Sequence, residues 1–449
     1  MAVRAETLAA IRFGYGLHPD QPAPDGADAL LSHVARGTTA PIVPAPNDLT
    51  WRRKMLARLR TLNKDVKSLE KRATIRKEAA QDTVVDLGRL LVNRAVSPNG
   101  FFERLVSFWA DHFTVGVRSP LQRVMMADFE ISALRPHIGG NFADLAISVT
   151  QHPAMIVYLD QQSSMGPNSP RGKRTGKGLN ENLARELLEL HTLGVDGSYT
   201  QADVRATAEV LTGYAVSIKD AGFRFAEQMS EPGAHNVMGR SYGGAPSHTH
   251  AETLIRDLAV HPQTARHIAE KLAIHFVSDT PDSGLVRHIE QAWLSSGGAL
   301  PAVYAALVEH PASWRGFGDK VKRPSDLVVS TLRASGLSAP EAKKLHPREL
   351  RRIVQAVRRL GQPMLRPPSP AGWPEEGSAW ITPQGLAQRV SYAKRAAELI
   401  AQRGADPRSF AETTLADALG GETAFAVSAA PEQWQGIALV IASPEFNRR

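Results

Sequence analysis

The sequence contains no cysteine. Disulfides, thiolate metal ligands, iron–sulfur clusters and cysteine nucleophiles are therefore excluded. No stretch approaches the roughly 18 consecutive apolar residues of a membrane helix, so we expect no membrane span. The N-terminus, Met1 to Leu8, lacks the apolar core of a signal peptide, so we expect the protein to be cytoplasmic or to be exported with a partner that carries the signal. Any chemistry has to come from histidines, carboxylates, hydroxyls or a bound cofactor.

The sequence also shows no internal repeats and no alternation of predicted strands with predicted helices. The chain has 449 residues, 43% of them hydrophobic, which is enough for a sizeable core. Its apolar residues recur mainly at helical spacing. The sequence therefore predicts an all-α, multi-helix globular unit over residues 1–449, with long irregular loops and at most a small β-hairpin, near Gly222 to Ala226.

Positive charge is concentrated in residues 51–80, which hold eleven Lys and Arg against three acids, while the net charge of the whole chain is +8. Apolar residues at helical spacing predict a basic amphipathic helix or helical hairpin there. Such a segment could contact nucleic acid, an anionic lipid or an acidic partner. Because base-reading side chains do not alternate with the charges, nucleic acid is disfavoured and a solvated helix face is the favoured interpretation.

The segment from Gly178 to Gly194 packs more polar, potentially reactive side chains into a helical pattern than any other. Leucines at helical spacing and a glycine after the last of them predict a helix of moderate length. His191 points into the apolar sector of this helix, and only a change of geometry in the last turn would let it share a ligand with the polar face. That face holds Asn182, Arg185, Glu186 and Glu189.

A second notable element is the aromatic helix from Phe101 to Phe113. His112 falls on its aromatic stripe, beside Trp109. The plainer interpretation is a core histidine with one hydrogen bond. The functional interpretation is a ligand or proton-transfer group whose pKa is lowered by burial, with Asp111 adjacent but pointing off the stripe.

Two irregular segments interrupt the helices. Residues 161–177 are rich in Gly, Pro, Ser and basic residues, and we expect a long loop without secondary structure. It does not match a nucleotide-binding loop, although Arg174 and Lys177 could attract an anion near the next helix. Residues 361–382 are rich in proline and must run extended.

Lys322 and Arg323 place two cations at the start of a predicted helix, where the helix dipole disfavours positive charge. This placement suggests that they hold something acidic. A simple surface salt bridge explains it equally well.

Several ordered motifs give the chain a resemblance to a known family. The segment from Asn180 to Gly194 resembles the signature of the bacterial family catalogued as domain of unknown function 1800. Further segments that agree with this family are Phe108–Phe113, Tyr199–Val204, Leu211–Gly213, His261–Ala265, Lys322–Pro324 and Arg366–Pro374. The chain departs from its relatives at Ser230, where they commonly have histidine.

The resemblance implies a largely helical fold but no settled activity. Many members of the family are exported. They are often encoded beside a protein of another uncharacterised family, domain of unknown function 1501, which resembles sulfatases. A sulfatase-like partner protein is therefore an expectation for this chain.

The favoured functional hypothesis is a metal-dependent oxidoreductase or hydrolase. Carboxylates and imidazoles from facing helices hold divalent transition metals in helical bundles. The candidate metal ligands are His112, Glu186, Glu189 and His191. The candidate catalytic residues are His112, Glu186 and Arg185, and the candidate cofactor-binding residues are Trp109, Lys322 and Arg323.

Three alternatives stay open at this point. The chain faintly resembles haem peroxidases, with His112 at the distal position and Arg185 and Glu186 near it, so a haem cofactor is a weaker expectation. It could be a non-catalytic partner or export companion of the sulfatase-like protein. It could also be a hydrolase without metal that uses Asp111 or Glu186 as base, although no nucleophile motif supports this.

Overall fold

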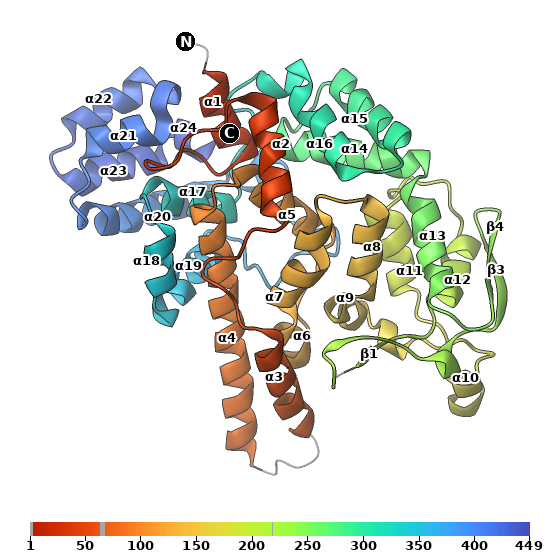
Figure 1. Ribbon diagram of the computed structural model, residues 1–449. Helices are drawn as coiled ribbons and strands as arrows, with labels where there is room; N and C mark the ends of the chain where they lie inside the picture. Colours follow the sequence, from red (N-terminus) through yellow and green to blue (C-terminus); the bar gives the residue numbers. More distant parts are fainter. Residues whose placement is uncertain (1–2, 63–67, 218) are drawn as a thin grey trace.

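The computed structural model describes residues 3–62, 68–217 and 219–449. This part of the chain is mainly helical and contains only two small two-stranded sheets, so the all-α prediction is confirmed (Figure 1). None of its helices is both long and apolar enough to cross a membrane. The middle of the predicted basic segment, residues 63–67, lies outside the described residues.

In the described residues of the first third of the chain, every regular element is a helix. Its elements are α1 (Ala5–Leu8), η1 (Ala9–Phe13), α2 (Gly26–Gly37), α3 (Leu49–Thr61), α4 (Leu69–Val96), α5 (Gly100–His112), α6 (Pro120–Val124), α7 (Met126–Asp128), η2 (Phe129–Leu134), η3 (Arg135–His137), α8 (Phe142–Gln151) and α9 (Pro153–Tyr158).

The strands all lie in the middle third. Its elements are η4 (Gln161–Ser163), α10 (Pro170–Thr175), α11 (Asn182–Glu186), η5 (Leu187–His191), α12 (Gln201–Val210), β1 (Tyr214–Ser217), β2 (Gly222–Phe225), η6 (Glu227–Met229), β3 (Gly233–Val237), β4 (Arg240–Gly244), α13 (Thr249–Ala259), α14 (Pro262–Phe276), α15 (Ser283–Ser296) and α16 (Leu300–Glu309).

The last third returns to helices. Its elements are η7 (Pro311–Trp314), α17 (Pro324–Ala334), α18 (Ala339–Lys344), α19 (Pro347–Arg359), η8 (Gly377–Ala379), α20 (Pro383–Ala401), α21 (Pro407–Leu415), η9 (Ala416–Ala418), α22 (Gly421–Ala429), α23 (Gln433–Ala442) and α24 (Pro444–Asn447).

The larger hydrophobic core surrounds α5. The aromatic residues of α5 recur at helical spacing, and Phe101 and Trp109 are fully buried. The ring centroid of Phe276 from α14 lies 5.6 Å from that of Phe101, and the indole nitrogen of Trp109 donates to the hydroxyl of Tyr304 from α16 at 2.7 Å. These contacts fix α14 and α16 against α5.

A second, smaller core joins the C-terminal helices α17, α19, α20, α21 and α23 (Figure 1). Small residues such as Ala393 and Ala397 let α20 approach α23 closely, and Val440 fills the contact from the other side. Because α17 packs on both α4 and α19, it connects this core to the rest of the molecule.

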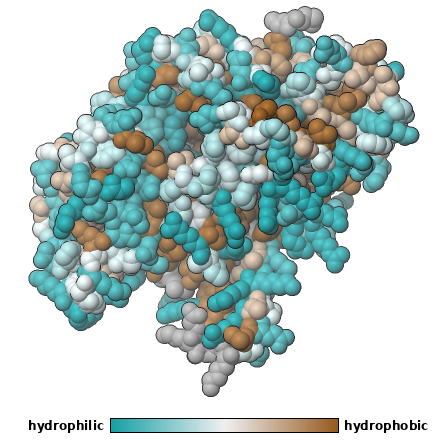
Figure 2. Space-filling model, turned by 180° about the vertical axis from the view of Figure 1, so that it is seen from behind, coloured by the Kyte–Doolittle hydropathy of each residue, from teal (hydrophilic) through white to brown (hydrophobic). Residues whose placement is uncertain are grey.

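The basic segment forms two helices that project from the body as an antiparallel pair, α3 and the first half of α4 (Figure 1). The side chains of Asp48 and Ser68 cap their N-termini, and Arg58 on α3 pairs with Glu78 on α4 at 2.7 Å. Figure 2 shows the projection from behind, at the lower edge of the molecule, with hydrophilic atoms over much of its surface. Arg53 and Lys54 are among its exposed cations.

The two small sheets follow α12. Strand β2 pairs antiparallel with β1, and this is the hairpin expected near Gly222. Strands β3 and β4 form a second hairpin, which the sequence did not predict, with Gly233 opposite Gly244.

The expectation of a structureless loop at 161–177 is wrong in part, because the segment contains η4 and α10. Ser169 caps α10 by accepting a hydrogen bond from the backbone nitrogen of Gly172, and Pro170 occupies a favoured first helical position. Gly176, at φ +67°, then ends the helix in the left-handed conformation.

The segment 361–382 is irregular, as the prolines require, apart from the short turn η8. Trp380 is buried and Trp373 is half-buried, with ring centroids 6.0 Å apart. Gly372 touches the end of α5: a Cβ added there would lie 2.7 Å from the carbonyl oxygen of Asp111, and its φ of +91° also favours glycine. The segment is therefore fixed against the candidate site.

Candidate active site

The C-terminal end of α5 places His112 among aromatic rings. The His112 ring centroid lies 5.3 Å from that of Trp109 and 4.5 Å from that of Phe113. His112 is 2% exposed, and its Nε2 lies 3.2 Å from the carbonyl oxygen of His191, to which it donates as the Nε2–H tautomer. In the described residues its Nδ1 has no hydrogen-bond partner. The core-histidine interpretation predicted one hydrogen bond, and His112 makes one. Any further role of His112 therefore depends on the side chains beside it.

Two further imidazoles lie beside His112. The ring centroids of His191 and His267 are each 6.2 Å from that of His112. His191 lies in η5, where the predicted α-helix widens into a π-helical turn. His267 comes from α14, and its Nδ1 donates to the carbonyl oxygen of Thr192 at 2.8 Å. That bond leaves the lone pair of the His267 Nε2 available as a proton acceptor.

Helix α14 carries a polar stripe that faces these histidines. His267, Lys271 and His275 are spaced four residues apart, so they stack on one face of the helix. Burial lowers the pKa of Lys271, and the negative charges of Asp111 and Glu375 only partly offset this effect. Among the described residues Lys271 forms no ion pair within 4.0 Å and no hydrogen bond. It is therefore a half-buried cation without a direct counter-ion.

The three imidazoles are neutral at physiological pH. Burial, followed by the charge of Lys271, lowers the pKa of His191 to about 3 and that of His267 to about 4. The same two causes hold the pKa of His112 well below its ordinary value. The site thus combines one cationic amine with three uncharged nitrogen bases.

A cluster of paired charges borders Lys271. Arg323 contacts Asp111 at 2.6 Å and Glu375 at 3.5 Å, and the Nδ1 of His275 donates to Glu375 at 2.6 Å. Although burial alone would raise it, the charge of Arg323 and the hydrogen bond from His275 hold the pKa of Glu375 well below its ordinary value. Because these carboxylates already have cationic partners, they do not neutralise Lys271.

Arg323 and Lys322 have different roles, although both were expected to hold something acidic. Arg323 does bind two carboxylates, as described above. Lys322 points elsewhere, with its Nζ 4.5 Å from the ring centroid of Phe446. Burial lowers the pKa of Lys322 to about 7, although Asp326 opposes this shift.

The polar face of the central helix lies apart from these groups. Arg185 pairs with Glu189 at 3.1 Å and with Glu181 at 3.4 Å, in a partly exposed network. Burial and the charge of Glu189 raise the pKa of Glu186, which is half-buried and lies near Tyr158. The structure thus brings together His112 and His191 of the predicted set, and it does not bring Glu186 and Glu189 to them.

The described residues contain no group of three or more His, Asp or Glu side chains arranged to hold a metal ion. The four predicted ligands therefore do not fit a shared metal in this geometry. Metal binding and haem binding stay predictions from the sequence. The catalytic step proposed for this protein uses neither group.

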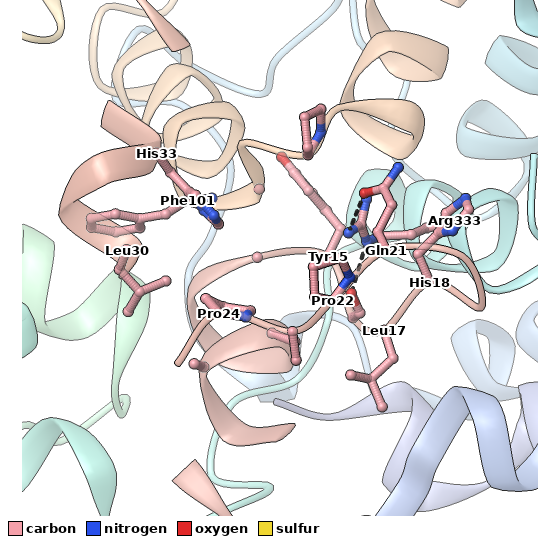
Figure 3. Close-up of a pocket in the computed structure, with 17 residues that line it drawn as sticks. Tyr15, Leu17, His18, Gln21, Pro22, Pro24, Leu30, His33, Phe101 and Arg333 are labelled. Carbon is pink, nitrogen blue, oxygen red and sulfur yellow. Dashed lines mark hydrogen bonds between the residues drawn. The ribbon is translucent and has the colours of Figure 1, made fainter. Parts of the chain in front are cut away.

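The cavities help to locate a binding region. One, drawn in Figure 3, has a volume of about 20 Å³, which suits a single water molecule. Its wall includes Arg333, whose guanidinium is already satisfied by the carbonyl oxygens of Gly16, Ala95 and Ser97. A second cavity, of about 120 Å³, adjoins the Asp111 and Arg323 pair.

Sequence reasoning missed Lys271, His267, His275 and Glu375. The first three carried a detectable signal, because polar side chains at spacing i, i+4, i+8 share a face of a helix. Glu375 carried none, since nothing in a proline-rich segment shows which helix it will touch.

The comparisons with known proteins give a family without an activity. The profile of a family described as "Protein of unknown function (DUF1800)" matches residues 8–448. No curated protein and no solved structure matches significantly. None of these results tests the sulfatase-like partner, which stays a prediction.

Proposed function

Because the chain belongs to the DUF1800 family of proteins of unknown function, its chemistry must be inferred from its own residues, and we propose that it is a hydrolase acting on an ester with an anionic group. The observation that carries the proposal is the pair Lys271 and His267. One is a half-buried cation without a direct counter-ion, and the other is a neutral, oriented imidazole one helical turn away.

Lys271 supplies the attraction for the anionic group. A half-buried ammonium without an ion pair has lost part of its hydration, and an anion at this position offsets that loss. A lowered pKa also makes the ammonium a stronger acid, which favours proton donation to a departing oxygen.

His267 supplies the base. Its Nδ1–H bond to Thr192 orients the ring, and its pKa of about 4 keeps Nε2 unprotonated at neutral pH. In the proposed step, Nε2 takes a proton from water while the water oxygen bonds to the electrophilic centre of the ester. The bond to the leaving oxygen breaks, and Lys271 protonates that oxygen. His112 and His191 keep the surroundings uncharged.

The test is hydrolysis of p-nitrophenyl phosphate, p-nitrophenyl sulfate and the p-nitrophenyl half-ester of succinate by purified protein. We expect turnover of at least one of them, with loss of kcat in Lys271→Met and His267→Gln. Lys271→Arg keeps the charge but cannot donate its proton, so it should retain KM and lose kcat. Glu270→Gln, an exposed change on the same helix, is the matched control. Turnover that is equal in folded Lys271→Met and in the control would refute the proposal.

A further inference from the structure

The cavity of about 120 Å³ lies between α4, α5, η2 and the segment 362–373. Its walls are mostly apolar and include Leu87, Leu90, Met364 and Leu365. An engineered apolar cavity of about 150 Å³ binds benzene. This cavity is slightly smaller but opens to solvent, so it has room for a ligand of about that size.

The charged groups at the cavity are already paired. Arg323 contacts Asp111 at 2.6 Å, and Arg94 contacts Glu130 at 2.5 Å. The two guanidinium groups and the two carboxylates have a net charge of zero. The cavity therefore does not attract an ion of either sign by its net charge. A neutral ligand avoids the desolvation cost that a charged one would meet there.

The cavity also has unpaired donors on uncharged side chains. Gln362 is 5% exposed, and its side-chain oxygen accepts a hydrogen bond from the backbone nitrogen of Ser325 at 2.8 Å. That bond fixes which end of the amide is oxygen, so the amide NH2 group points away from Ser325. Within the described chain this nitrogen has no hydrogen-bond partner. The indole N–H of Trp373, on the same wall, also has none there.

We propose that this cavity binds a small neutral carbonyl compound, with its apolar body against the leucines and its oxygen accepting hydrogen bonds from Gln362 and Trp373. A carbonyl oxygen has two lone pairs and can accept from both donors. Both donors are unpaired within the described chain, so a carbonyl oxygen in the cavity meets no competing acceptor there. The binding site is independent of the proposed hydrolysis, because it does not use Lys271 or His267.

The test uses cyclohexanone and the cyclohexylammonium ion, two probes of matched ring size, with ligand-observed NMR on the full chain. We expect cyclohexanone to bind with a Kd on the order of 1 mM, typical of so small a ligand, and the cation not to bind. Ala110→Leu, which fills the cavity, should abolish binding. Gln362→Glu keeps the acceptor for Ser325 but replaces the donor by a carboxylate oxygen, and it should weaken binding at least tenfold.

Two controls separate the site from other effects. Gln384→Glu adds the same charge at an exposed position and should bind like the parent protein. Lys271→Met should also bind normally, so failure of the hydrolase proposal leaves this result unchanged. The proposal is overturned if cyclohexanone does not bind, if the cation binds as well, or if folded Ala110→Leu and Gln362→Glu bind like the parent.

Discussion

Buried arginines and lysines in this protein are mostly satisfied by a partner. Arg12 donates to the carbonyl oxygens of Ser313 and Arg315, and Arg104 pairs with Asp326 at 3.1 Å. Lys271 and Lys322 differ from them, because the described residues give neither side chain an ion pair or a hydrogen bond. The Nζ of Lys322 lies over the ring of Phe446, whereas Lys271 lies one helical turn from the unprotonated imidazole of His267. This difference is why we assign a function to Lys271 and a structural role to the others.

The charge of Lys271 should affect the pKa of the neighbouring His267. Lys271 lowers the pKa of His267, which burial and this charge together bring to about 4. We expect Lys271→Met to raise the pKa of His267 toward its ordinary 6.5, measured by histidine NMR titration. Lys343→Met, an exposed change, is the control. An unchanged His267 would show that the two side chains do not interact.

Lys322 should make stability depend on pH. Burial lowers its pKa to about 7 in the folded protein, below its ordinary 10.5. Between these values the unfolded chain binds more protons, so the free energy of unfolding rises with pH in this window. We expect Lys322→Met to be more stable than the parent by on the order of 3 kcal/mol at pH 7 and to lose this advantage as pH approaches 10.5.

The measurement for Lys322 is chemical denaturation from pH 7 to 10, with Lys343→Met as the control. Equal pH dependence in the parent protein and in Lys322→Met would contradict the assignment.

At the scale of elements, helical spacing predicted the helices well and their mutual placement poorly. The aromatic pattern of α5 and the polar face of residues 182–189 could be read from the sequence, because both depend on local periodicity. The widening of the last turn of that helix into η5 could not, because it follows from tertiary packing around His191. The same holds for the second hairpin, β3 with β4.

The packing of α4 on α19 depends on a glycine. A Cβ added at Gly88 would lie 2.7 Å from the carbonyl oxygen of Leu350 and 2.9 Å from its Cβ. We expect Gly88→Ala to lower the free energy of unfolding by about 1–3 kcal/mol, measured by urea denaturation, because the helices must separate. Gly421→Ala, in a helical position with open space, should be neutral or slightly stabilising. A neutral Gly88→Ala would mean that the two helices do not touch there.

At the scale of the whole molecule, distant segments meet beside Lys271. Residues near positions 111, 191, 271, 323 and 375 lie in five separate segments, and hydrogen bonds and ion pairs join all five. The sequence identified three of these segments as motifs. It could not show that Asp111 would pair with Arg323 while Glu186 stays apart, because such pairing depends on how the helices are placed.

Glu375 connects this network to the irregular segment, so its loss should destabilise the whole fold. We expect Glu375→Gln to lower the free energy of unfolding by about 3 kcal/mol, because it removes a carboxylate charge that pairs with Arg323 and Lys320. The folded pKa of Glu375 lies well below its ordinary value, so its contribution is present above pH 4.5 and declines as pH falls further. The parent should therefore lose stability below pH 4.5 more steeply than Glu375→Gln, as measured by thermal unfolding. If the parent protein and Glu375→Gln lose stability equally below pH 4.5, the assigned role of Glu375 is contradicted.

The most direct test of the account is the pKa of the Lys271 amine, measured by competitive acetylation of the intact protein across pH with mass spectrometry of each lysine. We predict that Lys271 titrates below 10.5 and is protected by inorganic phosphate, while exposed Lys343 is not. If Lys271 titrates like Lys343 and phosphate does not protect it, the claim that Lys271 is a half-buried cation that binds an anion is contradicted.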